Sequence, residues 1–317
     1  MRAREPHKLR AVRYAGLRHA SGVQLKYFLR YQNLTAGMSD RRLEVIQRVL
    51  EYIEDDTLPG EIVDRAIVEF LEYRNKRVYL YQADPSRLCA LDASRFAHPI
   101  GDWSEAHIVL RPEIPRENYA YLDEDHLRVS FSETHRQPTV SMAMERVGWR
   151  RVGKVIVLDV ERRTGFATLS FDSPGRVHPH GSRPLDYYNF YRERAESLLG
   201  TQLIPFPLRD ALFKLEAGDL VRLQQGRGST LDGRVDIVAS GLDVRAMTAF
   251  QAVKPSIAVR DSGRYVWLPA GLSPHGGPHL LREVPTEIYG GTSMVRFTRD
   301  SLVHEVRYVL EQVRAHA

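Results

Sequence analysis

Apolar residues recur with the spacing of a helix through the first quarter of the chain. The stripe at residues 43–53 repeats every three or four positions, which leaves charged residues on the opposite face of the helix. A break with proline and glycine at residues 55–60 ends this stripe, and a second one follows at residues 62–71. The pattern predicts a helical module over residues 21–76.

From residue 77 the pattern changes to the alternation that is typical of strands. Residues 127–131 alternate apolar with polar positions, as in a sheet with one wet face. Residues 161–165 end in glycine between two such runs, which indicates a hairpin loop. Strands that follow one another without helices favour an antiparallel meander. The expected strands cover residues 78–81, 107–111, 127–132, 139–147, 154–160 and 166–171.

The second half of the chain mixes both patterns. Helices are predicted at residues 187–199 and 208–215, and a clear apolar stripe at 302–313 predicts a closing helix at 301–314. Further strands are expected near residues 219–223, 235–239, 256–259, 265–268 and 294–297.

These elements together predict an α+β fold. An N-terminal helical module is followed by a largely antiparallel β-rich body with packed helices and a C-terminal helix. The expected division of the chain is a basic arm at residues 1–20, the helical module at 21–76 and the body at 77–317. The loop at 172–184 is rich in proline, glycine and histidine, and it offers a possible boundary inside the body.

Composition narrows the class of protein. The chain has 317 residues, of which 43% are hydrophobic and 27% are charged, as in ordinary folded domains. A single cysteine, Cys89, excludes a disulfide framework and a zinc site built on several thiolates, and its apolar neighbours predict a buried thiol. No apolar run is long enough to span a membrane, and no secretory signal is evident. We therefore expect a cytoplasmic protein that does not bind membranes.

The positive charge is concentrated at the N-terminus. The net charge is +5, yet residues 1–33 hold eight basic side chains against the single acid Glu5, so the other 284 residues sum to −2. A basic arm beside a near-neutral body is typical of a contact with the phosphate backbone of nucleic acid. A solvated or packing tail is the alternative interpretation.

Two further stretches have the residue types that contact nucleic acid. Residues 146–154 hold four basic side chains and a tryptophan where a turn between strands is expected, although the tryptophan of such a hairpin could instead cap the core. Residues 224–229 form a flexible polar loop that could bond to phosphate or base edges. The candidate nucleic-acid-binding residues are Arg2, Arg4, Lys8, Arg10, Arg13, Arg18, Arg146, Trp149, Arg150, Arg151, Lys154 and Arg227.

One segment suggests a metal-dependent nuclease. Asp232-Gly-Arg-Val-Asp236, followed by a predicted strand that ends at Lys254, resembles the Asp-Gly-x-x-Asp strand of Mrr-like restriction endonucleases. In that family two carboxylates hold Mg²⁺ and a lysine helps to position water. This sequence departs from the pattern, since Gln251 is one residue too far from Lys254 and Ala252 occupies the acidic position. The resemblance covers about 25 residues. A bound Mg²⁺ is expected only if the protein is such a nuclease. The competing interpretation is that Asp-Gly simply forms a hairpin turn.

The sequence holds few other residue patterns that indicate a metal site or catalysis. The loops around His178-Pro-His180 and His275-Gly-Gly-Pro-His279 could share a metal if they met in space, and exposed loop histidines are the alternative. The sequence contains no nucleophile elbow, no His-Glu-x-x-His motif, no kinase signature and no complete phosphate-binding loop. We find no catalytic residues beyond the nuclease candidates and expect no cofactor.

The leading hypothesis is a nucleic-acid-binding protein without catalysis of its own, which works within a multi-protein system and binds DNA rather than RNA. The first alternative is the Mg²⁺-dependent nuclease with Asp232, Asp236 and Lys254, in either an active or a degenerate form. The second alternative is a protein–protein adaptor or a homo-oligomeric scaffold, with the apolar stripes at residues 43–71 or 302–313 as docking faces.

Overall fold

The computed structural model describes most of the chain, and it divides into two compact units. Unit 1 comprises residues 1–75, 207–291 and 295–317, and unit 2 comprises 76–206 and 292–294. Side chains at 6–8, 71, 116–122, 132–141, 146–153 and 184 are not described. The described residues are 6–37, 40–73, 76–92, 116–122, 124–141, 146–172, 184–239, 241–270, 272 and 280–317.

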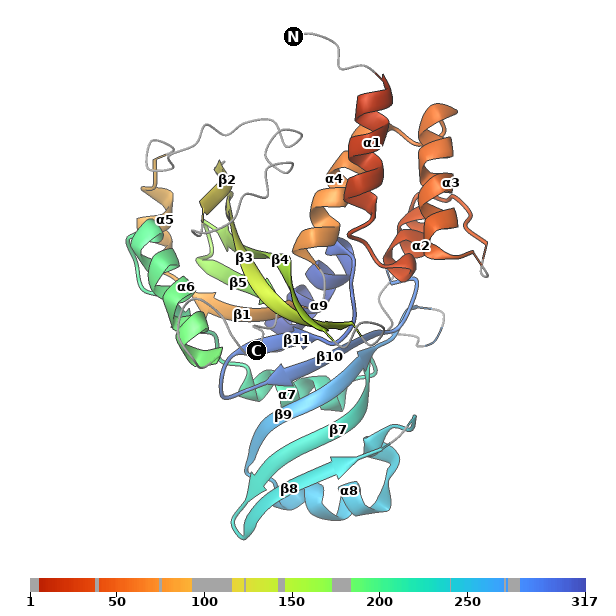
Figure 1. Cartoon of the computed structure of the whole chain (residues 1–317). Coiled ribbons are helices and arrows are strands. Elements are labelled where there is room, and N and C mark those ends of the chain that lie inside the picture. The colour runs from red at the N-terminus through yellow and green to blue at the C-terminus, as the bar shows by residue number, and fades with distance from the viewer. Residues whose placement is uncertain are drawn as a thin grey trace. The chain divides into compact units, whose positions relative to one another are not determined.

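Four helices form the N-terminal part of unit 1 (Figure 1). They are α1 (Pro6–Leu17), α2 (Gly22–Tyr31), α3 (Arg42–Glu54) and α4 (Gly60–Glu72). The side chain of Ser21 accepts a hydrogen bond from the Gln24 backbone N–H and so caps α2. Most of the described side chains in the predicted stripes of α3 and α4 are buried or partly buried, but Leu43 and Ile62 are exposed. The Phe28 ring meets the Phe70 ring edge to face at 5.6 Å. Most of the stripe at residues 43–71 therefore packs in the core of this unit, and only its exposed positions remain for a docking face.

Residues 6–17 form a helix where the sequence suggested a basic arm. Helix α1 contacts α4 so closely that a Cβ on Gly16 would lie 2.6 Å from Ile67 Cγ2. Leu17 is fully buried. This helix was not predicted because basic residues interrupt its apolar positions. Those apolar positions become buried only because α1 packs against α3 and α4.

The sheet of unit 1 has the strand order β11-β10-β9-β7-β8. The pairs β7–β8, β7–β9 and β9–β10 are antiparallel. On one face lie α7 (Arg209–Ala217) and α9 (Val303–Ala315), and the Trp267 ring meets Tyr308 of α9 at 6.2 Å. The apolar stripe of α9 is buried here, so it is unavailable as a docking face. The strands are β7 (Val221–Thr230), β8 (Gly233–Val238), β9 (Val259–Trp267), β10 (Val284–Tyr289) and β11 (Met294–Phe297).

Short helical segments complete unit 1. They are η2 (Val244–Ala246), α8 (Thr248–Val253) and η3 (Lys254–Ser256). The side chain of Asp243 caps η2 by accepting from the Arg245 backbone N–H at 2.9 Å.

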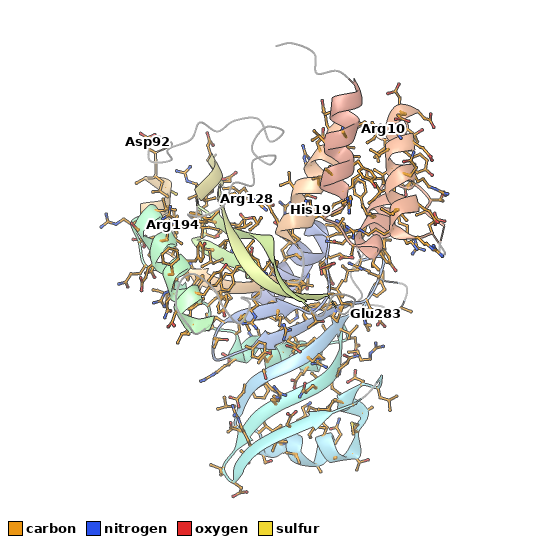
Figure 2. All side chains as sticks on the ribbon, viewed as in Figure 1. Arg10, His19, Asp92, Arg128, Arg194 and Glu283 are labelled. Atoms are coloured by element: carbon orange, nitrogen blue, oxygen red, sulfur yellow. The ribbon has the colours of Figure 1, made fainter. Side chains whose placement is uncertain are left out.

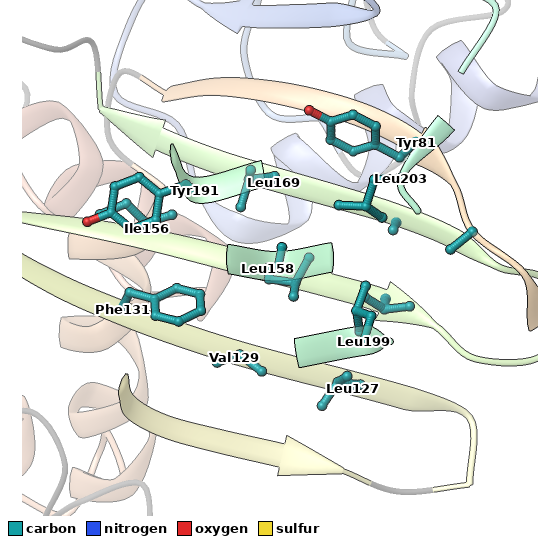
Figure 3. Packing of buried hydrophobic residues seen from close by; sticks show 14 of the residues in the cluster. Tyr81, Leu127, Val129, Phe131, Ile156, Leu158, Leu169, Tyr191, Leu199 and Leu203 are labelled. Carbon is teal, nitrogen blue, oxygen red and sulfur yellow. The ribbon is translucent and has the colours of Figure 1, made fainter. Parts of the chain in front are cut away.

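Unit 2 is an antiparallel meander with the order β2-β3-β4-β5-β1, and β6 pairs with β1. Helix α6 packs on one face of this sheet, where Tyr191 lies with Phe131, Ile156 and Leu158 in a shared core (Figure 3). The glycine expected in the β4–β5 hairpin is confirmed, because Gly165 has φ +75°. The elements are β1 (Lys76–Gln82), α5 (Pro85–Cys89), β2 (Arg116–Leu122), β3 (His126–Ser141), β4 (Arg146–Glu161), β5 (Phe166–Asp172), α6 (Pro184–Leu199) and β6 (Ile204–Pro205).

The predicted fold class is confirmed, since helices combine with mostly antiparallel strands. The compact units, however, change at residues 75/76 and 206/207 rather than within 172–184, and the helical module shares its unit with residues 207–291. Cys89 was expected to be buried, but it is exposed at the end of α5. Within the described ranges, no helix is long and apolar enough to cross a membrane.

Candidate nucleic-acid interface

Five arginine side chains lie on one face of the unit 1 sheet, and we call this set the arginine face. Successive residues of a strand point to opposite faces, so Arg264 lies on this face while Tyr265 and Trp267 point to α7 and α9. A bulge at Asp261 reverses the alternation and turns Arg260 to the helical side. The members of the arginine face are Arg222, Arg227, Arg234, Arg264 and Arg296.

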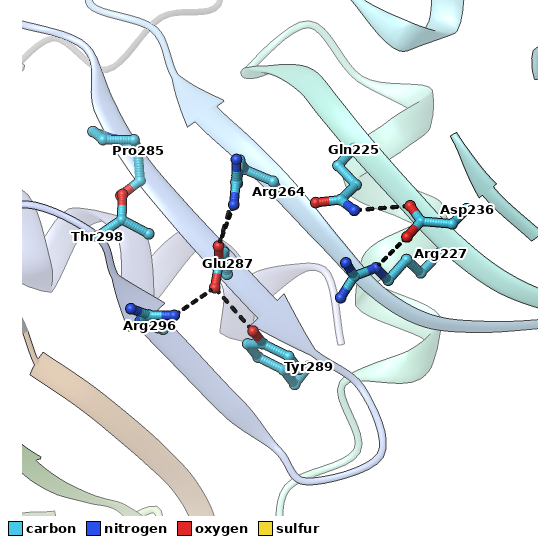
Figure 4. A network of polar contacts seen from close by, with 9 residues as sticks. All are labelled: Gln225, Arg227, Asp236, Arg264, Pro285, Glu287, Tyr289, Arg296 and Thr298. Atoms are coloured by element: carbon cyan, nitrogen blue, oxygen red, sulfur yellow. Dashed lines mark hydrogen bonds and ion pairs between the residues drawn. The ribbon is translucent and has the colours of Figure 1, made fainter. Parts of the chain in front are cut away.

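Glu287 on β10 holds two of these arginines in place (Figure 4). Its Oε1 accepts from Arg264 Nη2 at 2.7 Å, and its Oε2 accepts from Arg296 Nη1 at 3.1 Å and from the Tyr289 hydroxyl at 2.9 Å. Burial opposes ionisation of this carboxyl, but these contacts outweigh it and hold the pKa of Glu287 below its ordinary value. The carboxylate is therefore ionised at neutral pH and orients both guanidinium groups.

Asp236 on β8 orients Arg227 in the same way. Its two carboxylate oxygens accept from Gln225 Nε2 and from Arg227 Nε, both at 2.8 Å (Figure 4). These hydrogen bonds outweigh a small effect of burial, and they lower the pKa of the Asp236 carboxyl. Residues 224–229 were expected to be a flexible loop, but they lie in β7 because β8 and β9 pair with them on both sides.

The last two arginines differ in how firmly they are held. Arg222 Nη2 is 3.0 Å from a carboxylate oxygen of Glu283, a residue that lies just before β10 (Figure 2). In contrast, Arg234 Nε is 3.8 Å from Asp261. The side chain of Arg234 is 85% exposed, and Arg227 and Arg264 are about half exposed. Each guanidinium has five N–H donors in a fixed fork, so one or two bonds to a carboxylate leave further donors for an outside acceptor.

Two of the basic residues predicted near the N-terminus, Arg10 and Arg13, lie in α1 and form ion pairs within unit 1. Arg13 makes a bidentate pair with Asp64 of α4 at 2.8 Å, and Arg10 pairs with Glu54 of α3. Both arginines of α1 therefore neutralise acids of the same unit. Arg18 follows α1 and is exposed. Arg2, Arg4 and the side chain of Lys8 lie outside the described residues.

The basic stretch at residues 146–154 is a continuous part of β4 and not a turn. It pairs with β3 through all nine positions. Lys154 is buried and lies 3.6 Å from Asp172, whose other oxygen is 3.0 Å from Lys76. Lys154 thus belongs to an internal ion-pair cluster. Glycines in this stretch suggested a turn, but cross-strand pairing carries the strand through them. The backbone of Arg146, Trp149, Arg150 and Arg151 is described, and their side chains are not.

The nuclease candidates do not assemble as that motif requires. Asp232 lies in the two-residue loop of the β7–β8 hairpin, where Gly233 follows at φ +149°. Lys254 follows helix α8, so the strand expected to end at Lys254 is wrong. Asp236 is engaged by Arg227. Within the described ranges, no three His, Cys, Asp or Glu side chains are grouped as metal ligands.

The histidine loops cannot be compared with their prediction. His178, His180, His275 and His279 all lie outside the described residues. Whether a metal joins these loops is therefore left as a sequence-based hypothesis.

Four members of the arginine face were missed by the sequence reasoning: Arg222, Arg234, Arg264 and Arg296. A weak signal existed, because Arg222 and Arg264 occupy polar positions within strands whose neighbours are apolar. The strand β10 was not predicted, and its second residue, Pro285, is of a type that is uncommon within strands. The common face became visible only when the strand order and register were known.

Comparisons with known proteins add no further assignment. No protein-family model, curated protein or solved structure matches this chain. Function therefore has to be argued from the residues themselves.

Proposed function

We propose that this protein binds nucleic acid through the arginine face, with DNA as the preferred ligand, and that it acts without catalysis of its own within a multi-protein system. The observation that carries the proposal is the arrangement of arginines from four strands on one sheet face, with carboxylates holding several of them in fixed positions. Arginine is the side chain best suited to phosphate and to guanine edges because its donors form a planar fork.

The carboxylates on the arginine face orient the arginines without neutralising all of their positive charge. Five arginines share the face with Asp236, Asp261, Glu283 and Glu287, so the local charge excess is small. A small excess predicts moderate affinity with a limited salt dependence, in contrast to a packaging protein with a broad basic surface. Exposed Arg18 and the basic residues at positions 2, 4 and 8 add positive charge to the same chain.

The alternatives have less support. The nuclease requires Asp232, Asp236 and Lys254 to converge on Mg²⁺. Asp232 instead lies in a hairpin loop, Asp236 is in an ion pair and Lys254 follows a helix, which favours another role for each. The adaptor hypothesis was based on apolar stripes that now contribute to the core.

Fluorescence anisotropy with labelled double-stranded DNA, single-stranded DNA and RNA over a salt series tests the proposal. The key variant is the triple substitution Arg227→Ala/Arg264→Ala/Arg296→Ala. We expect weaker binding at every salt concentration. The slope of log affinity against log salt should fall by about 1 for each phosphate that the variant no longer neutralises.

The matched control is Arg87→Ala/Arg163→Ala/Arg307→Ala, which removes the same charge from exposed positions elsewhere. Equal weakening by both triple variants would assign the binding to overall charge and overturn the role of the arginine face. Absence of binding at low salt would overturn the proposed function. Running the DNA on a gel after incubation with Mg²⁺ tests the nuclease in the same samples.

A further inference from the structure

The strand β8 forms the edge of the unit 1 sheet (Figure 1). It pairs with β7 along one side, and no strand among the described residues pairs with its other side. An unprotected edge strand offers a row of backbone donors and acceptors to another strand, and proteins usually block such an edge with lysine, proline or a bulge. The segment Gly233–Val238 contains no lysine or proline.

The hydrogen-bond pattern identifies which residues face outward. The Ala239 backbone N–H donates to the Gln224 carbonyl oxygen of β7 at 2.9 Å. In an antiparallel ladder, every second residue bonds to a given neighbour. Counting back from Ala239, the odd-numbered residues bond to β7, so Arg234, Asp236 and Val238 direct their N–H and C=O groups to the free side.

Exposed apolar side chains flank the same edge. Leu231 in the hairpin loop is 98% exposed, and Leu242 beyond the other end of β8 is 70% exposed. Val238 at the end of the strand is 56% exposed. Apolar side chains gathered at both ends of an open edge gain free energy if a second surface removes them from water.

We propose that β8 pairs in antiparallel fashion with β8 of a second copy of this chain, about a two-fold axis at Val235. This register uses the outward backbone groups, and it places Arg234 of each copy opposite Asp236 of the other. Opposite charges directly across two strands stabilise the pair. The next register that uses the same backbone groups sets Asp236 opposite Asp236, where like charges repel.

The register also accounts for the exposed leucine of the hairpin. In the pair, the position of Leu231 in one copy falls opposite Ala239 of the other, next to Val238, and the two-fold axis repeats this proximity at the opposite end. The interface is thus self-complementary in backbone bonding, in charge and in apolar contacts. The inference does not rest on the proposed nucleic-acid binding, although Arg234 belongs to the arginine face and Asp236 orients Arg227.

Charge reversal tests this register in the full-length protein. Arg234→Asp sets acid against acid at both pairs, and Asp236→Arg sets base against base, so sedimentation velocity should show loss of the dimer for each variant alone. An equimolar mixture of the two variants should restore a heterodimer, because every cross-strand pair then joins opposite charges. Arg307→Asp on α9 makes the same charge change at an exposed site and should leave the dimer intact.

A disulfide experiment tests the axis with a substitution, Val235→Cys, that leaves every charged side chain in place. In a Cys89→Ser background, Val235→Cys places two thiols at the non-hydrogen-bonded pair on the axis, where Cα atoms lie about 4.5 Å apart and a disulfide can close. We expect an oxidised dimer for this variant and little for Asp236→Cys. A monomeric wild type up to its solubility limit would overturn the proposal. Dimers that resist both charge reversals, or crosslinking only through position 236, would also overturn it. Circular dichroism confirms folding of each variant.

Discussion

Arg260 Nη2 donates a 2.6 Å hydrogen bond to Glu216 Oε2, and both side chains are buried within unit 1. The Tyr265 hydroxyl donates to the other oxygen of Glu216 at 3.1 Å. Burial raises the pKa of Tyr265 well above its ordinary value, so this hydroxyl keeps its proton and stays a donor. The rings of Phe213 and Phe250 lie 5.7 and 5.4 Å from the guanidinium carbon. The pair thereby connects β9 to α7 and α8.

Removing one partner of this buried pair should be costly. Arg260→Met leaves the Glu216 carboxylate buried without its cation, and we expect a loss of about 3–5 kcal/mol in the free energy of unfolding. In the double variant Arg260→Met/Glu216→Gln, the amide oxygen still accepts from Tyr265 and no charge is buried, so much of that loss should be recovered. Urea denaturation measures both variants. Equal instability of the single and double variants would contradict this account.

We expect the contacts of Glu287 to make part of the free energy of unfolding sensitive to acid. Because the pKa of Glu287 is lower in the folded state than its ordinary value of 4.5, its contribution is complete above that value. It is lost as the pH falls through the lower, folded-state value. Glu287→Gln should therefore reduce stability by roughly 1 kcal/mol at pH 7 and by progressively less as the pH falls below 4.5 and through the folded-state pKa. Thermal melts across this range measure the difference, with exposed Glu311→Gln as the control.

In unit 2, Asp172 should be needed to neutralise buried lysine. Lys76 is fully buried, with its Nζ 3.0 Å from Asp172 and donating to the Val155 carbonyl oxygen at 2.6 Å. Asp172→Asn removes the negative charge and is expected to cost about 3–5 kcal/mol. Asp125→Asn, at an exposed pair with Arg163, should cost less than about 1 kcal/mol. Similar losses for both variants in chemical denaturation would show that Asp172 does not have this role.

Two glycines with nearly equal φ allow the cost of backbone strain to be compared with the added cost of a steric overlap. Gly165 has φ +75°, and a Cβ there would overlap the Ala83 carbonyl oxygen, whereas Gly241 has φ +76° and open space around the same position. Gly241→Ala should cost roughly 1–2 kcal/mol from conformation alone. Gly165→Ala should cost about 1–3 kcal/mol more because of the overlap. Thermal denaturation compares them, and equal costs would argue against a tight β4–β5 hairpin.

Local sequence patterns predicted the helices and strands whose hydrophobic periodicity is contained in their own consecutive residues. The stripes at residues 43–53 and 302–313 predicted helices α3 and α9, and β-prone runs at residues 127–132, 154–160 and 166–171 predicted parts of β3, β4 and β5. The glycines at 165 and 233 marked two hairpin turns because few other residues adopt their backbone angles. Helix α1 and strand β10 were missed, since each depends on partners elsewhere in the chain more than on its own residues.

The candidate site was harder to predict than the fold. Arg227 was named from its sequence context, but its neighbours Arg264 and Arg296 share a face only through pairing between distant strands. Lys154 had the same sequence context as a nucleic-acid contact, and tertiary structure buried it beside Asp172.

The sequence alone determined the α+β class, the antiparallel order of consecutive hairpins and most helix positions, because periodicity and turn residues act over a few positions. Tertiary structure alone decided which charges meet, which basic residues stay exposed and which strand forms an edge. The physical reason is that an ion pair or a sheet face depends on register between segments far apart in the chain. A shift of one residue in that register would move every side chain of the strand to the opposite face.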